Sequence, residues 1–296
     1  MNARFIRFQQ DGLAPSWKRH IAGQGHIDLD ADGLRLSNLN AIDSTYTNAQ
    51  IDDYQGLARR NFLWRPPLRL SIRARFSHPG AHEVTPAPPQ PIHANETPRS
   101  AIDTRTTHYA PRDPLLGTAG FGFWNDPFLM TGGCMPVLPK ALWFFYASPP
   151  SNMKLALDTP GWGWKAAGID AARLPFFLLA PTAPIAIPLM RIGALYRRLW
   201  PIGQRAIGVC ERALTSTMAD WHVYTIDWGR DAVHFFVDGA PVHTCDTSPS
   251  GPLGLVVWID NQFMRITPWG ELGYGVIARP GHQSLWVDWL SLHATP

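Results

Sequence analysis

The residues with the clearest potential for chemistry are two aspartates and one histidine near aromatic side chains. Asp126 follows Trp124 by two positions, and Asp260 follows Trp258 by the same spacing. Side chains two apart share a face of a β-strand, so both carboxylates are expected to point into one aromatic cleft. A carboxyl group desolvated there has a raised pKa and can act as a general acid or base, with His222 as a third partner. All three also fit structural roles in turns and a hairpin.

Aromatic residues are numerous, because the chain contains 13 Trp and 14 Phe. This number suits a sheet protein with a ligand-binding face, although packing inside a sandwich explains it equally well. The candidate ligand-binding residues are Trp124, Trp143, Phe145, Tyr146, Trp162, Trp164 and Trp258. For the pair at 162 and 164, a ligand platform and a core pair are both compatible with the spacing.

The spacing of potential metal ligands predicts no metal site, and no cofactor is expected. The histidines between positions 78 and 108 match no face of a helix or strand. The aspartates at 28, 30 and 32 lack the glutamate that closes a twelve-residue calcium loop, so a solvated turn is expected there. Cys134, Cys210 and Cys245 are an odd number without C-x-x-C spacing, which favours reduced thiols.

The net charge and the N-terminal sequence bear on which partners the protein binds and in which compartment it is found. A formal net charge of +3 is small for this length and argues against a nucleic-acid-binding surface. The N-terminal sequence carries charges among its apolar residues and lacks the uninterrupted apolar run of a signal peptide. The protein is therefore expected in the cytoplasm.

Strands must position the candidate residues, because alternation of apolar and polar side chains recurs along the chain. Residues 68–76 alternate strictly. Four further runs are typical of strands, at 117–128, 141–148, 254–261 and 284–292. The clearest unit is residues 220–243, where two alternating strands flank a Gly-Arg-Asp break and end at Asp238-Gly239. This pattern predicts a β-hairpin.

The hairpin contains a W-H-x-Y strand at 221–224 and an F-x-V-D-G strand at 235–239. This combination resembles the concanavalin A-like lectin/glucanase superfamily, and in particular the family 16 glycoside hydrolases. The resemblance implies an all-β fold, a concanavalin A-like antiparallel β-sandwich or jelly roll, with residues 1–296 forming a single domain.

The resemblance also places one strand where the family carries its catalytic motif E-x-D-x-x-E. In this chain that strand is Ala-Leu-Trp-Phe-Phe-Tyr at 141–146. A retaining glycosidase needs two carboxyl groups about 5 to 5.5 Å apart across the scissile bond. An aromatic strand cannot supply them, so the fold and the cleft are expected but the hydrolytic mechanism is not.

Two segments do not fit a jelly roll. Residues 77–115 are rich in Pro and His without periodicity, which predicts a long loop. Residues 171–215 exceed the length that a connection needs. Their apolar run 174–190 holds four prolines, which exclude a regular helix or strand there and also a membrane span.

The second half of the long segment has a helical pattern. From Arg191 to Leu214 apolar residues recur every three or four positions and Arg every seven, which predicts an amphipathic helix. Within residues 171–215, the run 174–190 is expected to pack over the mouth of the cleft as a lid, with the helix from Arg191 to Leu214 lying across the surface beside it. A helix on the sandwich surface and a peripheral membrane contact through 174–214 are the alternatives.

Together these features predict a binding protein or a non-hydrolytic enzyme for a mostly apolar small molecule. The aromatic strand at 141–148 favours an apolar ligand over a sugar, because it offers few hydrogen-bonding groups. A carbohydrate-active protein, either a lectin or a diverged glycoside hydrolase, is the first alternative, and a structural or interaction module is the second. The sequence leaves open whether the protein is an enzyme and which oligomeric state it has.

Overall fold

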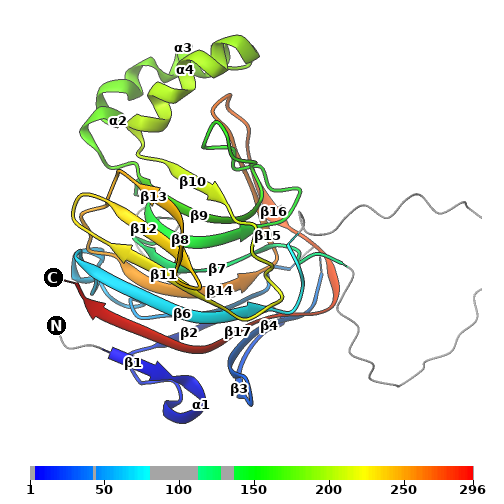
Figure 1. Cartoon of the computed structure of the whole chain (residues 1–296). Helices are drawn as coiled ribbons and strands as arrows, with labels where there is room; N and C mark the ends of the chain where they lie inside the picture. The colour runs from blue at the N-terminus through cyan, green and yellow to red at the C-terminus, as the bar shows by residue number, and fades with distance from the viewer. Residues whose placement is uncertain (1–3, 43–44, 81–112, 128–136, 296) are drawn as a thin grey trace, which may run out of the picture.

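The computed structural model describes residues 4–42, 45–80, 113–127 and 137–295. Two large antiparallel sheets pack face to face, and a group of short helices stands at one edge of the sandwich (Figure 1). The predicted jelly-roll sandwich is therefore confirmed. Most of the loop predicted at 77–115 lies outside the described residues.

The first sheet, sheet A, follows the order β13-β12-β11-β6-β17-β4-β3, with β1 paired to β17. Its strands are β13 (Ala240–Cys245), β12 (Val233–Val237), β11 (His222–Trp228), β6 (Leu68–Phe76), β17 (Arg279–Ala294), β4 (Gly33–Ala41), β3 (Gly25–Asp30) and β1 (Arg4–Arg7). The predicted hairpin at 220–243 is the pair β11 and β12, in which Tyr224 lies opposite Val237.

The second sheet, sheet B, follows the order β10-β9-β8-β7-β14-β5-β2. Its strands are β10 (Cys210–Ala213), β9 (Gly163–Asp170), β8 (Lys140–Ala147), β7 (Thr118–Trp124), β14 (Gly254–Asp260), β5 (Asn48–Asp52) and β2 (Lys18–Ala22). A separate two-stranded hairpin joins β15 (Gln262–Ile266) to β16 (Leu272–Val276). The helices are α1 (Phe8–Asp11), η1 (Arg59–Asn61), α2 (Leu174–Leu179), η2 (Ala180–Thr182), α3 (Ala183–Leu189) and α4 (Gly193–Ala206).

The core lies between the two sheets, and strand alternation decides which side chains enter it. Strand β6 buries Leu70 and Ile72 and turns Arg69 and Arg73 outward, as its strict alternation predicts. Sheet B contributes aromatic side chains, such as Phe144, to the same core. Every second residue of a strand in sheet B points into this core, so the residues in between must point to the outer face of the sheet.

The structure corrects the prediction for two of the three cysteines. Cys210 on β10 and Cys245 on β13 form a disulfide, with their Cα atoms 5.7 Å apart. Strands β10 and β13 are end strands of different sheets, and the sandwich brings these two edges together. The sequence could not indicate this proximity, because the two cysteines are 35 positions apart and belong to different sheets. Cys134 lies outside the described residues.

The structure also corrects the prediction for residues 174–190. The run forms the short helices α2, η2 and α3, because Pro175 and Pro184 occupy first-turn positions, where a missing N–H breaks no helical bond. The predicted amphipathic helix is α4, with Pro201 inside it. It ends at Ala206, since Gly208 adopts a left-handed conformation before β10 begins.

No helix among the described residues has the length and apolar character needed to cross a membrane.

Candidate functional site

Four aromatic side chains form a cluster on the outer face of sheet B. They are Trp124 on β7, Trp143 and Phe145 on β8, and Trp258 on β14. Trp124 and Trp258 are parallel, with ring centroids 6.5 Å apart, and Trp143 lies 5.7 Å from Trp258 and 5.3 Å from Phe145. The strands place them there because the sequence neighbours Phe123, Phe144 and Ile259 point into the core.

Glycines on β7 leave the space that these rings occupy. Gly120 lies opposite Phe145 on one side and Trp258 on the other, and Gly122 lies opposite Trp143. A Cβ atom on Gly120 would come within 2.9 Å of the Trp258 ring, and one on Gly122 within 2.8 Å of the Trp143 Cβ. The two glycines therefore let the aromatic side chains lie close over β7.

A cavity of about 300 Å³ extends from this cluster. Its walls come from sheet B, from the loop before β8, from the β15–β16 hairpin and from the helical insertion. The apolar side chains of the walls include Leu138, Met153, Leu155, Phe176, Ile207, Val209, Phe263 and Ile266. The structure thus makes Phe176 of α2 and Ile207, just after α4, part of the cavity wall.

Asp260 is the buried carboxylate at the β14 side of the cavity. Its Oδ1 accepts hydrogen bonds from the Thr118 amide at 3.2 Å, the Thr118 hydroxyl at 2.8 Å and the Gln262 amide at 2.9 Å. Burial outweighs these hydrogen bonds and raises the pKa of Asp260 to about 6. A carboxyl group with this pKa exchanges its proton near neutral pH, which is the property of a general acid or base.

We expect Asp260→Asn to remove part of the pH dependence of folding stability. The pKa of this carboxyl is about 6 in the folded protein against an ordinary value of 3.8. Its favourable contribution is therefore fully present below about pH 4 and is lost as pH rises through 6, by about 3 kcal/mol. Urea unfolding of the wild type from pH 4 to pH 7 should show this fall, and Asp260→Asn should flatten it.

The matched control is Asp53→Asn. Burial also raises the pKa of Asp53 to about 6, and its carboxylate accepts hydrogen bonds from Trp64 and Leu255. Asp53 does not line the cavity. Both variants should flatten the stability curve, but Asp260→Asn alone should change the pH dependence of ligand binding. A stability curve of Asp260→Asn parallel to that of the wild type would contradict the assignment.

An ion pair that the sequence did not predict lies at the β10 side of the cavity, where Glu211 is part of the wall. Lys165 on β9 and Glu211 on β10 lie 3.3 Å apart, with side chains 1% and 10% exposed. Burial lowers the pKa of Lys165 and raises that of Glu211, so each group relies on the other to stay charged. Alternation could have indicated where Lys165 points. Trp164 lies in the core, so the next residue, Lys165, must point to the outer face of sheet B.

Three of the predicted ligand-binding residues do not line the cavity. Tyr146 and Trp164 are fully buried in the core between the sheets. The Tyr146 hydroxyl donates a hydrogen bond to the Leu115 carbonyl at 2.8 Å. The prediction is wrong for both, because each lies one position from a residue on the outer face of sheet B: Tyr146 follows Phe145, and Trp164 precedes Lys165. Trp162 is half-buried ahead of β9 and does not line the cavity.

The three candidate catalytic residues do not form one site. Asp260 lies opposite Thr118, whereas Asp126 follows the other end of β7, so at least six residues, about 20 Å, separate them along the strand. Asp126 has a left-handed backbone, and its carbonyl accepts a hydrogen bond from Arg59. Strand alternation therefore does not extend to Asp126.

His222 lies on β11 of sheet A, whereas Asp260 lies on sheet B. The His222 Nδ1 atom is 2.6 Å from the Asp238 carboxylate of the adjacent turn, and the two side chains fix the end of the hairpin. The prediction of a shared site is wrong for His222, because the W-H-x-Y strand belongs to the opposite sheet.

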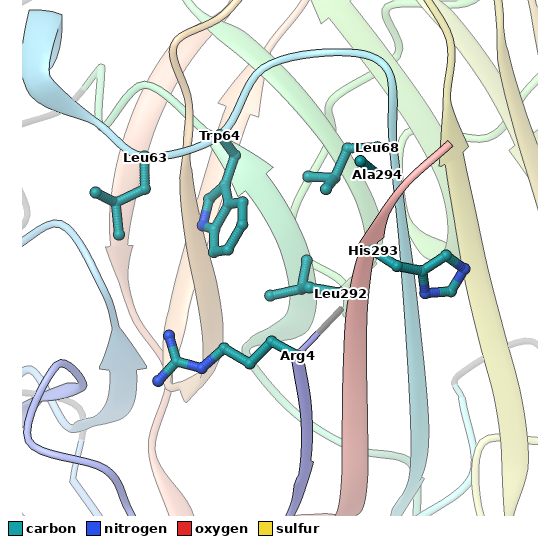
Figure 2. Close-up of a pocket in the computed structure, with 7 residues that line it drawn as sticks. All are labelled: Arg4, Leu63, Trp64, Leu68, Leu292, His293 and Ala294. Atoms are coloured by element: carbon teal, nitrogen blue, oxygen red, sulfur yellow. The ribbon is translucent and has the colours of Figure 1, made fainter. Parts of the chain in front are cut away.

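A smaller hollow of about 260 Å³ lies where β1 meets the end of β17 (Figure 2). Leu63, Trp64, Leu68 and Leu292 line it, and in Figure 2 the His293 ring points away from Leu292 to the other side of β17. Arg4 is the charged side chain at its rim. Among the described residues, the lining of this hollow contains no carboxylate or nucleophile.

Potential metal ligands come together at one point among the described residues. Atoms of Cys210, His243 and Cys245 lie within 4.8 Å of one another. The disulfide uses both sulfur atoms, and metals bind thiolates, so this group is not an open ligand set.

Comparisons with known proteins find likeness to family 16 enzymes. The family model described as glycosyl hydrolases family 16 matches residues 203–266, which include the hairpin β11–β12. A β-1,3-1,4-glucanase (lichenase) from a mouse hindgut metagenome is 12% identical, with a TM-score of 0.48 and 100% of both chains covered. No protein in a search of curated sequences matches the chain.

Two further solved structures are similar at the same level. A laminarinase from Flavobacterium sp. UMI-01 is 10% identical, with a TM-score of 0.46 and 98% of each chain covered. A Bacillus licheniformis β-glucanase is 10% identical, with a TM-score of 0.45 and coverage of 100% of this chain and 99% of that one. The chain folds as a concanavalin A-like sandwich that is similar to family 16 glycoside hydrolases.

Proposed function

We propose that the protein binds a carbohydrate ligand on the aromatic cluster of sheet B and does not hydrolyse it by double displacement. The observation that carries this proposal is the cluster of Trp124, Trp143 and Trp258 beside Asp260, on a sheet of a family 16-like sandwich. Flat aromatic faces pack against the C–H faces of sugar rings, and a few convergent polar groups fix their orientation. Gln50, Thr118 and Gln262 line the same end of the cavity and supply such groups.

The positions of the carboxylates support the non-hydrolytic part of the proposal. Among the described residues, Asp260 and Glu211 are the carboxylates that line the cavity. They lie on β14 and β10, four strand spacings apart in sheet B, which is about 19 Å. Glycosidases need pairs separated by about 5 to 9.5 Å. The strand β8 presents Ala141, Trp143 and Phe145 to this face instead of carboxylates.

The test is titration of the protein with β-1,3- and β-1,3-1,4-linked gluco-oligosaccharides while tryptophan fluorescence is recorded. Trp143→Ala should weaken binding at least tenfold. The matched control is Trp221→Ala, since Trp221 is also half-buried but lies against Arg73 and Arg75 of sheet A. Release of reducing ends, or the absence of binding at millimolar oligosaccharide, would overturn the proposal.

A second candidate ligand is an elongated apolar molecule, which the walls of the cavity favour. Leu155, Phe176, Ile207 and Ile266 surround the aromatic cluster with aliphatic and aromatic surface. Dodecanoic acid is a suitable probe. Displacement of the fatty acid by an oligosaccharide would support the carbohydrate site, and fatty-acid binding without such competition would support the apolar ligand instead.

A further inference from the structure

The helical insertion exposes apolar side chains that were expected to be buried against the sandwich. Leu174, Leu178 and Ile185 are 70%, 72% and 71% exposed. Leu174, Phe177 and Leu178 lie three and four positions apart on one face of α2, and Ile185 and Leu189 lie four apart on α3. We call these five residues, which are all exposed, the outer apolar surface.

The opposite face of the insertion packs against the rest of the protein. The apolar side chains are therefore exposed although the helices are in contact with the sandwich. Met190, Tyr196 and Trp200 are buried against Leu155, Leu157 and Trp269. The Trp200 indole donates a hydrogen bond to the Leu155 carbonyl at 2.7 Å. The helices stand at the edge of the sandwich (Figure 1), and these contacts attach them to it.

The charged side chains that the insertion itself carries all have one sign. Residues 171–210 contain five arginines and no aspartate or glutamate. Arg191, Arg197, Arg198 and Arg205 are exposed, and none of them forms an ion pair within the described part of the chain. A segment that combines exposed apolar side chains with unpaired arginines is suited to a partner with an apolar interior and a negatively charged surface layer.

We propose that the outer apolar surface docks onto a lipid bilayer that contains anionic lipids. The apolar side chains would enter the boundary between headgroups and acyl chains, and the arginines would contact lipid phosphates. A second copy of the chain is the less suitable occupant, because a two-fold interface on this face would bring arginines against arginines. Phe176 of α2 lines the cavity, so docking brings one wall of the cavity to the bilayer.

The test uses the full chain in flotation with vesicles of phosphatidylcholine alone and with 30% phosphatidylglycerol. The protein should float with the anionic vesicles, and 0.5 M salt should release it. Leu178→Asp with Ile185→Asp should reduce the bound fraction at least tenfold. The matched control is Ile21→Asp with Leu29→Asp, two exposed residues on edge strands β2 and β3.

A second pair of variants tests the electrostatic part. Arg197→Gln with Arg198→Gln should reduce binding to anionic vesicles at least fivefold. Arg60→Gln with Arg65→Gln, which removes the same charge from exposed positions in and after η1, should not. Unchanged thermal unfolding of each variant checks the fold. Failure of the wild type to float, equal losses in both controls, or a dimer in sedimentation that Leu178→Asp abolishes would each overturn the proposal.

Discussion

Lys165→Met should lower the free energy of unfolding by about 3 to 5 kcal/mol at pH 7. The Lys165 ammonium lies 3.3 Å from the Glu211 carboxylate, and both side chains are almost fully buried. Without the ammonium, the carboxylate stays in a site that penalises its charge. Methionine keeps the length of the side chain, so the loss measures the missing charge rather than a cavity.

The pH dependence of this variant follows from the same argument. Burial already raises the pKa of Glu211, and the loss of Lys165 raises it further. The raised pKa means that the carboxyl group contributes to stability below its unfolded pKa, and that this contribution is lost as pH rises. The cost of Lys165→Met should therefore be smaller at pH 5 than at pH 7, as urea unfolding at both values would show.

A double variant and an exposed pair serve as controls. Lys165→Met with Glu211→Gln removes both charges and should recover most of the lost stability, because a neutral pair in a buried site is often as stable as an ion pair. Arg73→Met breaks the more exposed pair with Asp288 on sheet A and should cost less than about 1 kcal/mol. If Lys165→Met and Arg73→Met lowered the free energy of unfolding equally, burial would not be the reason for the large effect at Lys165.

Reduction of the Cys210–Cys245 disulfide should cost about 4 kcal/mol. The bond closes a loop with a sequence separation of 35, and a crosslink of this length removes about that much free energy from the unfolded ensemble. Urea unfolding of the wild type should shift to lower urea when dithiothreitol is added. Cys210→Ser with Cys245→Ser should start at the lower midpoint and respond no further.

Counting thiols gives an independent check of the disulfide. The chain has three cysteines, so the protein unfolded without reductant should show one free thiol, and Cys134→Ser should show none. Three free thiols, with a urea midpoint that dithiothreitol leaves unchanged, would contradict the bond. Structural disulfides are characteristic of oxidising compartments. Finding the Cys210–Cys245 bond in protein purified from its native cells would therefore contradict the expected location in the reducing cytoplasm.

The strands could be predicted because the alternation that defines them is local and periodic, whereas their assembly into a sandwich was implied by the family resemblance. Strand β6 and the β11–β12 hairpin are defined by alternation and turn residues within a few positions of each other. The same alternation separates Trp143 on the cavity side from Phe144 in the core. It failed for Asp126, because the left-handed backbone at that residue ends the strand geometry on which alternation depends.

Contacts between distant strands could not be predicted in this way. The pairing of Lys165 with Glu211 depends on the registry of β9 and β10, which are separated in the sequence by the helical insertion. The disulfide depends on how the edges of two sheets meet. The exposure of Leu178 and Ile185 was missed for a different reason, because packing over the mouth of the cleft was favoured over the membrane contact that the same composition also allows.

The strands on either side of the helical insertion have a further consequence. Cys210 at the start of β10 lies opposite Gly168 of β9, and the Asp170 amide donates to the Ile207 carbonyl. The whole insertion is thus an enlarged hairpin loop whose two ends are neighbours in one sheet. Such a loop can be shortened to a tight turn, or exchanged for the loop of another sandwich, without shifting the registry of any strand. The helices can therefore be removed or transferred as one unit, provided that the exchanged segment ends before Cys210 and Glu211 of β10.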